Sequence, residues 1–147
     1  MTDLVELYKQ VILDHNRSPR NFREIINADK AIEGINPLCG DKIMLYINFD
    51  NNIVKQASFK GTGCAISIAS SSLMTEEIIG KSKNECINLF NKIHIILTAD
   101  SSHNINLGKL NSLSGVREYP SRVKCASLAW HALKSALTTS DATTTTE

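Results

Sequence analysis

The sequence predicts an α+β protein, because helical patterns lie on both sides of a predicted β-hairpin. Near the N-terminus, apolar residues from Leu4 to Ile12 recur at the spacing of one helix face. Two short β-rich runs follow at residues 42–49 and 53–60, and the Asp-Asn-Asn segment between them is typical of a turn. We therefore expect these two runs to pair as antiparallel strands.

Two helices are predicted after the hairpin. The first follows the segment GTG, beginning near Cys64 and ending at Gly80. The second begins at Ser82, where Glu85 three residues later completes a capping box, and extends to about Leu97. Both helices would therefore start at positions that local side chains and backbone amides define.

The last predicted helix begins at Pro120, because proline suits the first position of a helix. Residues 21–36 show no regular pattern, and residues 98–118 are rich in loop-forming residues without a clear period. We expect both segments to be irregular.

The length of 147 residues indicates one domain, which we place at residues 1–138. Residues 139–147 are rich in threonine, have no large apolar residue to bury, and are expected to form a disordered tail. The formal net charge of +1 gives no reason to expect nucleic acid or a membrane as a partner. No signal peptide is recognisable at the N-terminus, so we expect the protein in the cytoplasm.

The four cysteines raise the question of whether some of them meet, since disulfides are rare in a reducing compartment. If the hairpin turn is centred on residues 51–52, Cys39 faces Cys64 and Asp41 faces Thr62. Cys39 and Asp41 are two residues apart, so in an extended chain both point to the same face. Cys64 would stand at the start of a helix, where free amides favour a thiolate. Local geometry thus brings three potential anionic ligands together.

Cys125, in the first turns of the last helix, is the fourth candidate ligand. It lies in line with three alanines, and such a stripe of small residues permits close approach to the hairpin ends. Arg122, one turn earlier on a similar face, could steady a thiolate or a carboxylate there. Three thiolates and one carboxylate suit a tetrahedral divalent ion, for which zinc is the default. A carboxylate among thiolates suggests coordination that is meant to open or change.

Structural explanations apply to the other candidates. A single cysteine is most often a small buried apolar residue, and Cys86 lies within a helical pattern without polar companions, so we assign it to the core. Trp130 lies on the apolar stripe of the last helix and is also assigned to the core. The run of three serines at residues 70–72 has no histidine and acid spaced to activate a nucleophile.

Three segments resemble the U-type family of iron–sulfur cluster assembly proteins: NPLCGD, GTGCAISIASSSLMTE and SGVREYPSRVKCASLAWHAL. Their order, spacing and flanking residues match, and the resemblance covers about residues 3–138. It implies an α+β fold with a small, mostly antiparallel three-stranded sheet and helices packed on one side. It also implies a metal site exposed at one end of the molecule.

Within this family the last segment is similar to the SufU branch, since Lys124 stands where scaffolds of the IscU type carry a histidine. The resemblance implies a zinc protein, similar to a sulfurtransferase, that accepts sulfur from a SufS-type cysteine desulfurase. By the same resemblance Cys39 accepts the sulfur and Arg122 supports the site. The implied metal ligands are Cys39, Asp41, Cys64 and Cys125.

Two alternatives remain open at this stage. One is a scaffold on which a transient iron–sulfur cluster is built across the same ligands and passed to other iron–sulfur assembly proteins. The other is a structural zinc module without sulfur chemistry. Iron and acid-labile sulfide after reconstitution would favour the first, and rapid formation of a persulfide on Cys39 would exclude the second.

Overall fold

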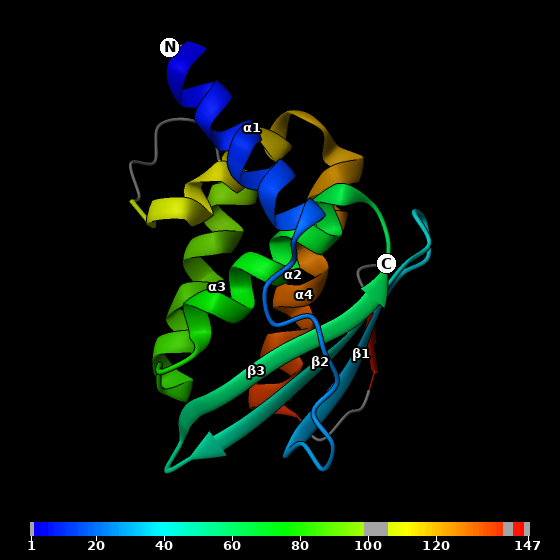
Figure 1. Ribbon diagram of the computed structural model, residues 1–147, viewed down its shortest axis with the longest axis vertical. Coiled ribbons are helices and arrows are strands. Elements are labelled where there is room, and N and C mark those ends of the chain that lie inside the picture. The colour runs from blue at the N-terminus through cyan, green and yellow to red at the C-terminus, as the bar shows by residue number, and fades with distance from the viewer. Residues whose placement is uncertain (1, 99–105, 140–142, 146–147) are drawn as a thin grey trace.

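A mixed four-stranded sheet with helices on one face forms the architecture (Figure 1). The computed structural model describes residues 2–98, 106–139 and 143–145. In chain order the elements are α1 (Thr2–Arg17), β1 (Lys30–Asn36), β2 (Asp41–Asp50), β3 (Ile53–Thr62), α2 (Ala65–Ile78), α3 (Lys83–Thr98), the 3-10 helix η1 (Gly108–Glu118), α4 (Pro120–Thr138) and β4 (Thr143–Thr145).

The sheet differs from the expected three-stranded one, because a fourth strand pairs parallel with β1. The strand order is β3-β2-β1-β4, and the pairs β1–β2 and β2–β3 are antiparallel. β4 aligns Thr143–Thr145 with Glu33–Ile35 and comes from the segment that was expected to be disordered. Threonine is β-branched and suits a strand. The prediction of disorder rested on the low complexity of the tail and did not take this strand propensity into account. The α+β class is confirmed, but the prediction of a three-stranded, mostly antiparallel sheet is wrong.

β1 lies in a segment, residues 21–36, that the sequence predicted as irregular. Its centre contains Gly34, a residue that weakens a strand pattern. A Cβ atom at Gly34 would lie 3.2 Å from Cδ1 of Leu128, so the glycine allows α4 to pack closely over β1. Packing between elements, rather than local preference, therefore determines this strand.

The predicted hairpin forms, but its register shifts at a β-bulge between Asn48 and Phe49. Beyond the bulge Lys42, and not Asp41, pairs with Thr62. β2 begins at Asp41, so Cys39 lies in the turn between β1 and β2 instead of in an extended strand. The expected pairings of Cys39 and Asp41 are therefore wrong in detail, because the bulge adds one residue to one strand.

The helix starts agree with the local signals. Ser82 N–H donates to Glu85 Oε1 at 2.9 Å, and Glu85 N–H donates to Ser82 Oγ at 3.1 Å, which is the predicted capping box. α4 begins at Pro120 as expected. The region predicted as loop-rich contains the 3-10 helix η1, and residues 99–105 lie outside the described residues.

Hydrogen bonds in the core hold α2 against α4. Trp130 is 1% exposed, and its Nε1–H donates to Ser70 Oγ at 3.0 Å. Ser70 in turn donates to the carbonyl of Ala126 at 2.6 Å. Cys86 is fully buried, and burial raises its pKa to about 11, so it remains a neutral thiol. The core assignments of Trp130 and Cys86 are both confirmed.

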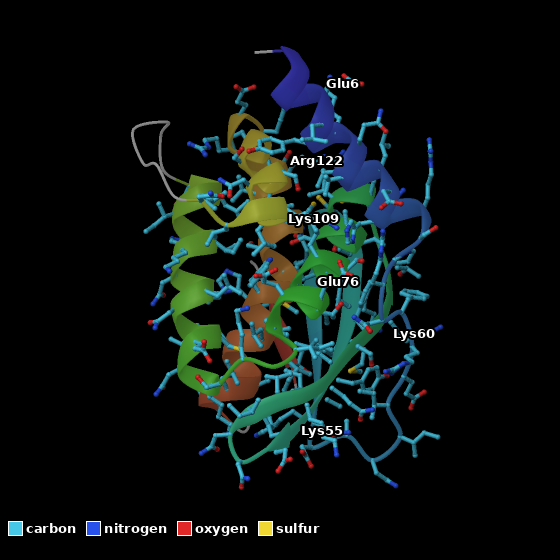
Figure 2. All side chains as sticks on the ribbon, turned by 60° about the vertical axis from the view of Figure 1, so that its left-hand side comes forward. Glu6, Lys55, Lys60, Glu76, Lys109 and Arg122 are labelled. Carbon is cyan, nitrogen blue, oxygen red and sulfur yellow. The ribbon has the colours of Figure 1, made fainter. Side chains whose placement is uncertain are left out.

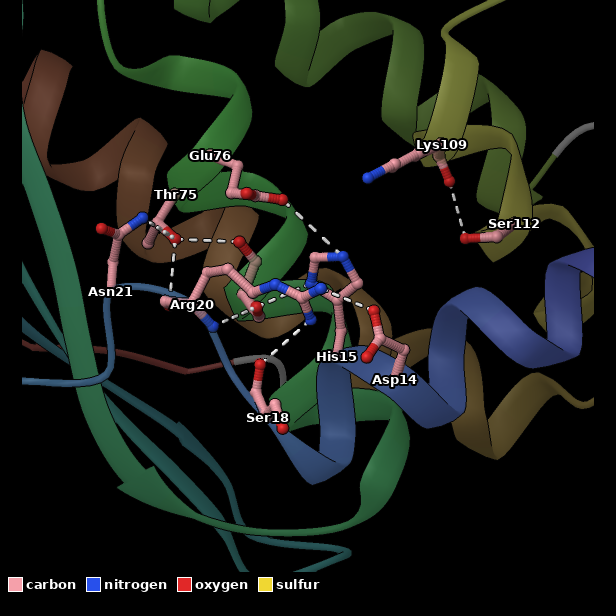
Figure 3. Close-up of polar contacts among 10 residues, drawn as sticks. Asp14, His15, Ser18, Arg20, Asn21, Thr75, Glu76, Lys109 and Ser112 are labelled. Carbon is pink, nitrogen blue, oxygen red and sulfur yellow. Dashed lines mark hydrogen bonds and ion pairs between the residues drawn. The ribbon is translucent and has the colours of Figure 1, made fainter.

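A second polar network fixes α1 on α2 (Figure 3). His15, 1% exposed, contacts Ser72 Oγ through Nδ1 at 2.7 Å, and its Nε2 lies 3.7 Å from Glu76 Oε1. The backbone N–H of Arg20 also donates to Ser72 Oγ, at 2.8 Å. One serine of the predicted non-catalytic run therefore joins α1, the chain after it and α2.

In the part of the chain that the structure describes, no helix has the length and apolar character needed to cross a membrane.

Candidate metal centre

Four of the predicted site residues come from four different elements at one end of the sheet. Cys39 lies in the β1–β2 turn, Asp41 is the first residue of β2, Cys64 is the N-cap of α2, and Cys125 lies in α4. Ligand atoms of Cys39, Asp41 and Cys125 all lie within 4.8 Å of one another. The sequence did not establish that Cys125 approaches Cys39 and Asp41. The fold brings these three residues together.

The turn that holds Cys39 is fixed by the backbone of Asn36. The carbonyl oxygen of Asn36 accepts hydrogen bonds from Cys39 N–H at 3.3 Å and Gly40 N–H at 2.9 Å. Gly40 has φ +73°, a left-handed conformation that glycine adopts without a steric penalty. Cys39 is exposed and follows Leu38, which is 72% exposed. This thiol is thus the part of the cluster that a partner molecule can reach.

Asp41 is fully buried, and its two carboxylate oxygens have different surroundings. Oδ1 accepts a hydrogen bond from the backbone N–H of Cys64 at 2.9 Å. Oδ2 lies 4.0 Å from Cys64 Sγ and 3.4 Å from Asn36 Nδ2. A Cβ atom at Gly63 would lie 2.5 Å from Oδ1, so only glycine leaves room for the carboxylate here. Oδ2 therefore remains directed at the thiols.

Cys64 does not belong to the group whose ligand atoms all lie within 4.8 Å, although its Sγ is close to Asp41 Oδ2. It is half-buried and precedes the first turn of α2. Its place at the N-terminus of α2 agrees with the prediction.

Cys125 is fully buried, and burial is the main cause that raises the pKa of its thiol. Hydrogen bonding with Asp41, Cys39 and Cys64 raises the pKa further. The thiol donates to the carbonyl of Ser121 at 3.7 Å. A cluster of groups that each become anionic disfavours ionisation of the most buried member, and a cation placed between them would reverse this effect.

Arg122 lies on the exposed side of the cluster. Interaction with Cys125, and secondarily with Cys64, raises the pKa of its guanidinium. Figure 2 shows Arg122 at the same end of the molecule as Glu6 of α1, far from Lys55 in the hairpin. Arg122 also lines a groove of about 750 Å³, which α1 and η1 border together with Ile66 of α2. Arg122 precedes Cys125 by three residues, about one turn of α4, so the two side chains lie on a similar face of that helix.

Two residues at the site were not singled out from the sequence. Asn36 is fully buried, and its Nδ2 lies 3.5 Å from Cys125 Sγ as well as 3.4 Å from Asp41 Oδ2. Gly63 makes room for the carboxylate. Both residues flank the motif cysteines in sequence, but only the three-dimensional contacts show what each of them does.

Cys39, Asp41 and Cys125, with Cys64 beside Asp41, form a cluster of thiols and a carboxylate that could hold a metal ion. Residues 7–145 match the family of the NifU-like N terminal domain, and the chain belongs to this family.

Two relatives illustrate the range of the family. The chain is 40% identical to the zinc-dependent sulfurtransferase SufU of Bacillus subtilis strain 168, over 90% of each chain. It is 38% identical to the iron–sulfur cluster assembly scaffold protein IscU of Streptococcus pyogenes serotype M1, over 93% of this chain and 86% of that protein.

Solved structures share the fold. The crystal structure of FiSufU from Fervidobacterium islandicum AW-1 is 36% identical and superposes with a TM-score of 0.80, covering 87% of this chain and 94% of the other. The N-terminal part of a NifU-like protein from Brucella abortus is 20% identical with a TM-score of 0.79, and supports the fold alone.

Proposed function

We propose that this protein is a zinc-dependent sulfur acceptor that takes persulfide sulfur from a cysteine desulfurase for iron–sulfur cluster assembly. One observation supports it above all: Cys39 is exposed, while Asp41 and Cys125 of the same cluster are fully buried. A purely structural zinc site has no need of an exposed ligand, whereas a sulfur acceptor requires one. The similarity to the B. subtilis sulfurtransferase points the same way.

The donor set of the cluster fits zinc. Sulfur and carboxylate oxygen are both common zinc ligands, with metal–sulfur bonds of about 2.3 Å. We assign Cys39, Asp41, Cys64 and Cys125 as the ligands, with Oδ2 as the contributing oxygen of Asp41, because Oδ1 is engaged by Cys64 N–H. Bound zinc would keep the thiols deprotonated and protected from oxidation.

The transfer step follows from thiol–disulfide chemistry. The thiolate of Cys39 attacks the outer sulfur of the donor persulfide. A new sulfur–sulfur bond forms on Cys39, the bond within the donor persulfide breaks, and the donor cysteine leaves as a thiolate. The proton on the transferred sulfur moves with it, so neither an oxidant nor a reductant is consumed. Arg122 stands beside Cys125 and Cys64 and balances negative charge while Cys39 is engaged.

Membership of a family that works in iron–sulfur assembly implies a cysteine desulfurase as the partner. We propose the SufS type more specifically, on the similarity to SufU and on Lys124, which stands where IscU-type scaffolds carry a histidine. We place the protein in the cytoplasm, where its four free cysteines would stay reduced.

The second candidate function is a scaffold that holds a transient iron–sulfur cluster on the same ligands, and the similarity to the S. pyogenes scaffold protein favours it. Anaerobic reconstitution with iron and sulfide distinguishes the two. Stable binding of iron and acid-labile sulfide, followed by transfer to an apo-protein, would support the scaffold.

The deciding experiment measures turnover of a SufS-type cysteine desulfurase with and without the zinc-loaded protein, in the absence of iron. We expect a large, saturable rise in turnover and a persulfide on Cys39 detectable by mass spectrometry. Cys39→Ala should abolish both, because the attacking sulfur is gone. Cys86→Ala is the control, since this thiol is fully buried and is not part of the cluster, and it should retain the rise. A rise that survives in Cys39→Ala would contradict the proposal.

A further inference from the structure

Asn36, the last residue of β1, contacts three members of the metal cluster through different groups. Its side-chain Nδ2 donates to Asp41 Oδ2 at 3.4 Å and to Cys125 Sγ at 3.5 Å. Its backbone carbonyl accepts from Cys39 N–H at 3.3 Å. One residue therefore joins ligands from the β1–β2 turn, from β2 and from α4.

The position of Asn36 is determined by the sheet rather than by the cluster. Asn36 pairs with Asp41 at the end of the antiparallel β1–β2 ladder, so its amide starts from a fixed backbone. β4 pairs with the three preceding residues, Glu33–Ile35, and holds the other edge of β1. Because β1 is paired with β2 on one edge and with β4 on the other, the backbone of this strand is fixed. A side-chain amide on a fixed backbone can determine where its hydrogen-bond acceptors lie.

The chemistry of the side chain suits this task. Asn36 is fully buried, and an arginine or lysine in its place would add a buried charge. A neutral amide donates hydrogen bonds to a carboxylate and to a sulfur without adding charge, and such contacts orient metal ligands. A hydrogen bond to a ligating sulfur also withdraws electron density from the metal–sulfur bond.

A purely structural role explains the side chain less well. Its Oδ1 is buried and has no hydrogen-bond partner among the residues that the structure describes. An unsatisfied buried acceptor costs stability. For folding alone, a side chain without this acceptor would therefore be more favourable at position 36. The backbone carbonyl that shapes the turn would be present with any residue, and it requires no amide side chain.

We propose that Asn36 is a positioning residue of the metal centre, whose side-chain amide directs Asp41 Oδ2 and Cys125 Sγ toward one ion. The inference rests on the proposed zinc site and extends it to a residue that does not bind the metal.

The test compares the wild-type protein with Asn36→Leu, which has the same number and branching of side-chain heavy atoms but no hydrogen-bond donor, and with Asn36→Gln, which keeps the amide. Zinc affinity is measured by competition with a chromophoric chelator, and cobalt-substituted protein reports the sulfur-to-metal charge-transfer bands. We expect Asn36→Leu to bind zinc about 10- to 100-fold more weakly and to shift these bands. Asn36→Gln should restore part of the affinity.

Metal-free unfolding separates positioning from folding. We expect the metal-free Asn36→Leu protein to unfold at a midpoint close to that of the wild-type protein, since the substitution also removes the unpaired Oδ1. Asn48→Leu is the matched control, because it removes a strand asparagine whose amide donates to Gln56 Oε1, away from the cluster. This control should keep both zinc affinity and the cobalt bands.

Two results would overturn the inference. Wild-type affinity and unchanged cobalt bands in Asn36→Leu would show that the amide does not position the ligands. A loss of affinity that Asn36→Gln shares fully, together with loss of metal-free stability in both variants, would show a role in folding only. Failure of the wild-type protein to bind zinc or cobalt would instead refute the proposed metal site.

Discussion

At the scale of single residues, the site is graded from buried to exposed. Asp41 and Cys125 are fully buried, Cys64 is half-buried and Cys39 is exposed. The buried pair can retain an ion while the exposed thiol reacts, because loss of one ligand need not open the whole cluster to water. In the proposed function, the buried residues would hold the metal and the exposed Cys39 would accept the sulfur.

Gly63 gives a residue-scale prediction. We expect Gly63→Ala to weaken zinc binding by about tenfold or more, as is typical when a neighbour displaces a metal ligand. The added Cβ would lie 2.5 Å from Asp41 Oδ1, so the carboxylate must move. Competition with a chromophoric chelator measures the loss. Gly115→Ala is the control, since no atom of the described residues lies within 4 Å of a Cβ atom there, and it should keep wild-type affinity. Equal affinities for the two variants would contradict the prediction.

At the scale of elements, α1 depends on a histidine that burial keeps neutral. Burial is the largest cause that lowers the pKa of His15, and Arg20 and Lys109 lower it further, while Glu76 and Asp14 act in the opposite direction. The unfolded chain, with an ordinary pKa of 6.5, therefore binds a proton more readily than the folded protein as the pH falls. Protonation of His15 thus favours unfolding.

The expected result is a steeper loss of stability in acid for the wild-type protein than for His15→Gln. His15 contributes no penalty above its ordinary pKa of 6.5, and the penalty grows as the pH falls below this value toward the lowered pKa. Denaturant unfolding at about pH 7.5 and about pH 5.5 measures the difference. Other groups, such as His131, titrate in both proteins and cancel in the comparison. Identical losses would show that His15 titrates alike in the folded and unfolded states.

Elements whose starts are encoded locally could be predicted from the sequence. The capping box at Ser82 and the proline at position 120 define two helix starts, and both formed where expected. β1 could not be predicted, because Gly34 serves the packing of α4 rather than strand propensity. The register of the hairpin failed by one residue, since nothing in the residues near Asn48 signals a bulge.

In the site, too, contacts within one hairpin could be predicted from the sequence, whereas contacts that depend on the packing of distant elements could not. The proximity of Asp41 to Cys64 was predictable because one hairpin joins them, and Cys64 N–H indeed donates to Asp41. Cys125 is about 60 residues further along the chain, and its approach depends on the packing of α4 against the sheet and α2. Asn36 was missed because an asparagine before a proline is equally typical of an ordinary turn.

At the scale of the whole molecule, the C-terminal segment closes the open edge of the sheet. β4 is short and polar, with its middle residue half-buried, and it covers the edge of β1 next to Asn36. An uncovered strand edge offers unpaired backbone groups to other chains. The tail therefore contributes to the fold through backbone pairing rather than through apolar burial.

A chain that ends at Thr138 tests this role. We expect it to fold, because β4 contributes little apolar surface, but we expect faster hydrogen exchange at the β1 amides that face β4, within Glu33–Ile35. Hydrogen–deuterium exchange read by mass spectrometry or NMR measures the change. The amides that pair β2 with β3 are the internal control and should keep their protection. Unchanged exchange in β1 would show that the tail does not pair with it in solution.

The bulge between Asn48 and Phe49 has a consequence for how related chains can diverge. Asp41 and Cys64 stand 23 positions apart, and the bulge is part of that length. The unpaired residue is Lys55 of β3, because Asn48 pairs with Gln56 and Phe49 pairs with Val54. Deleting Lys55 would move each side chain of the β3 segment after it to the opposite face and would change where Cys64 lies relative to Asp41. We therefore expect related chains that keep the carboxylate and the second cysteine together to keep the length of the hairpin between them.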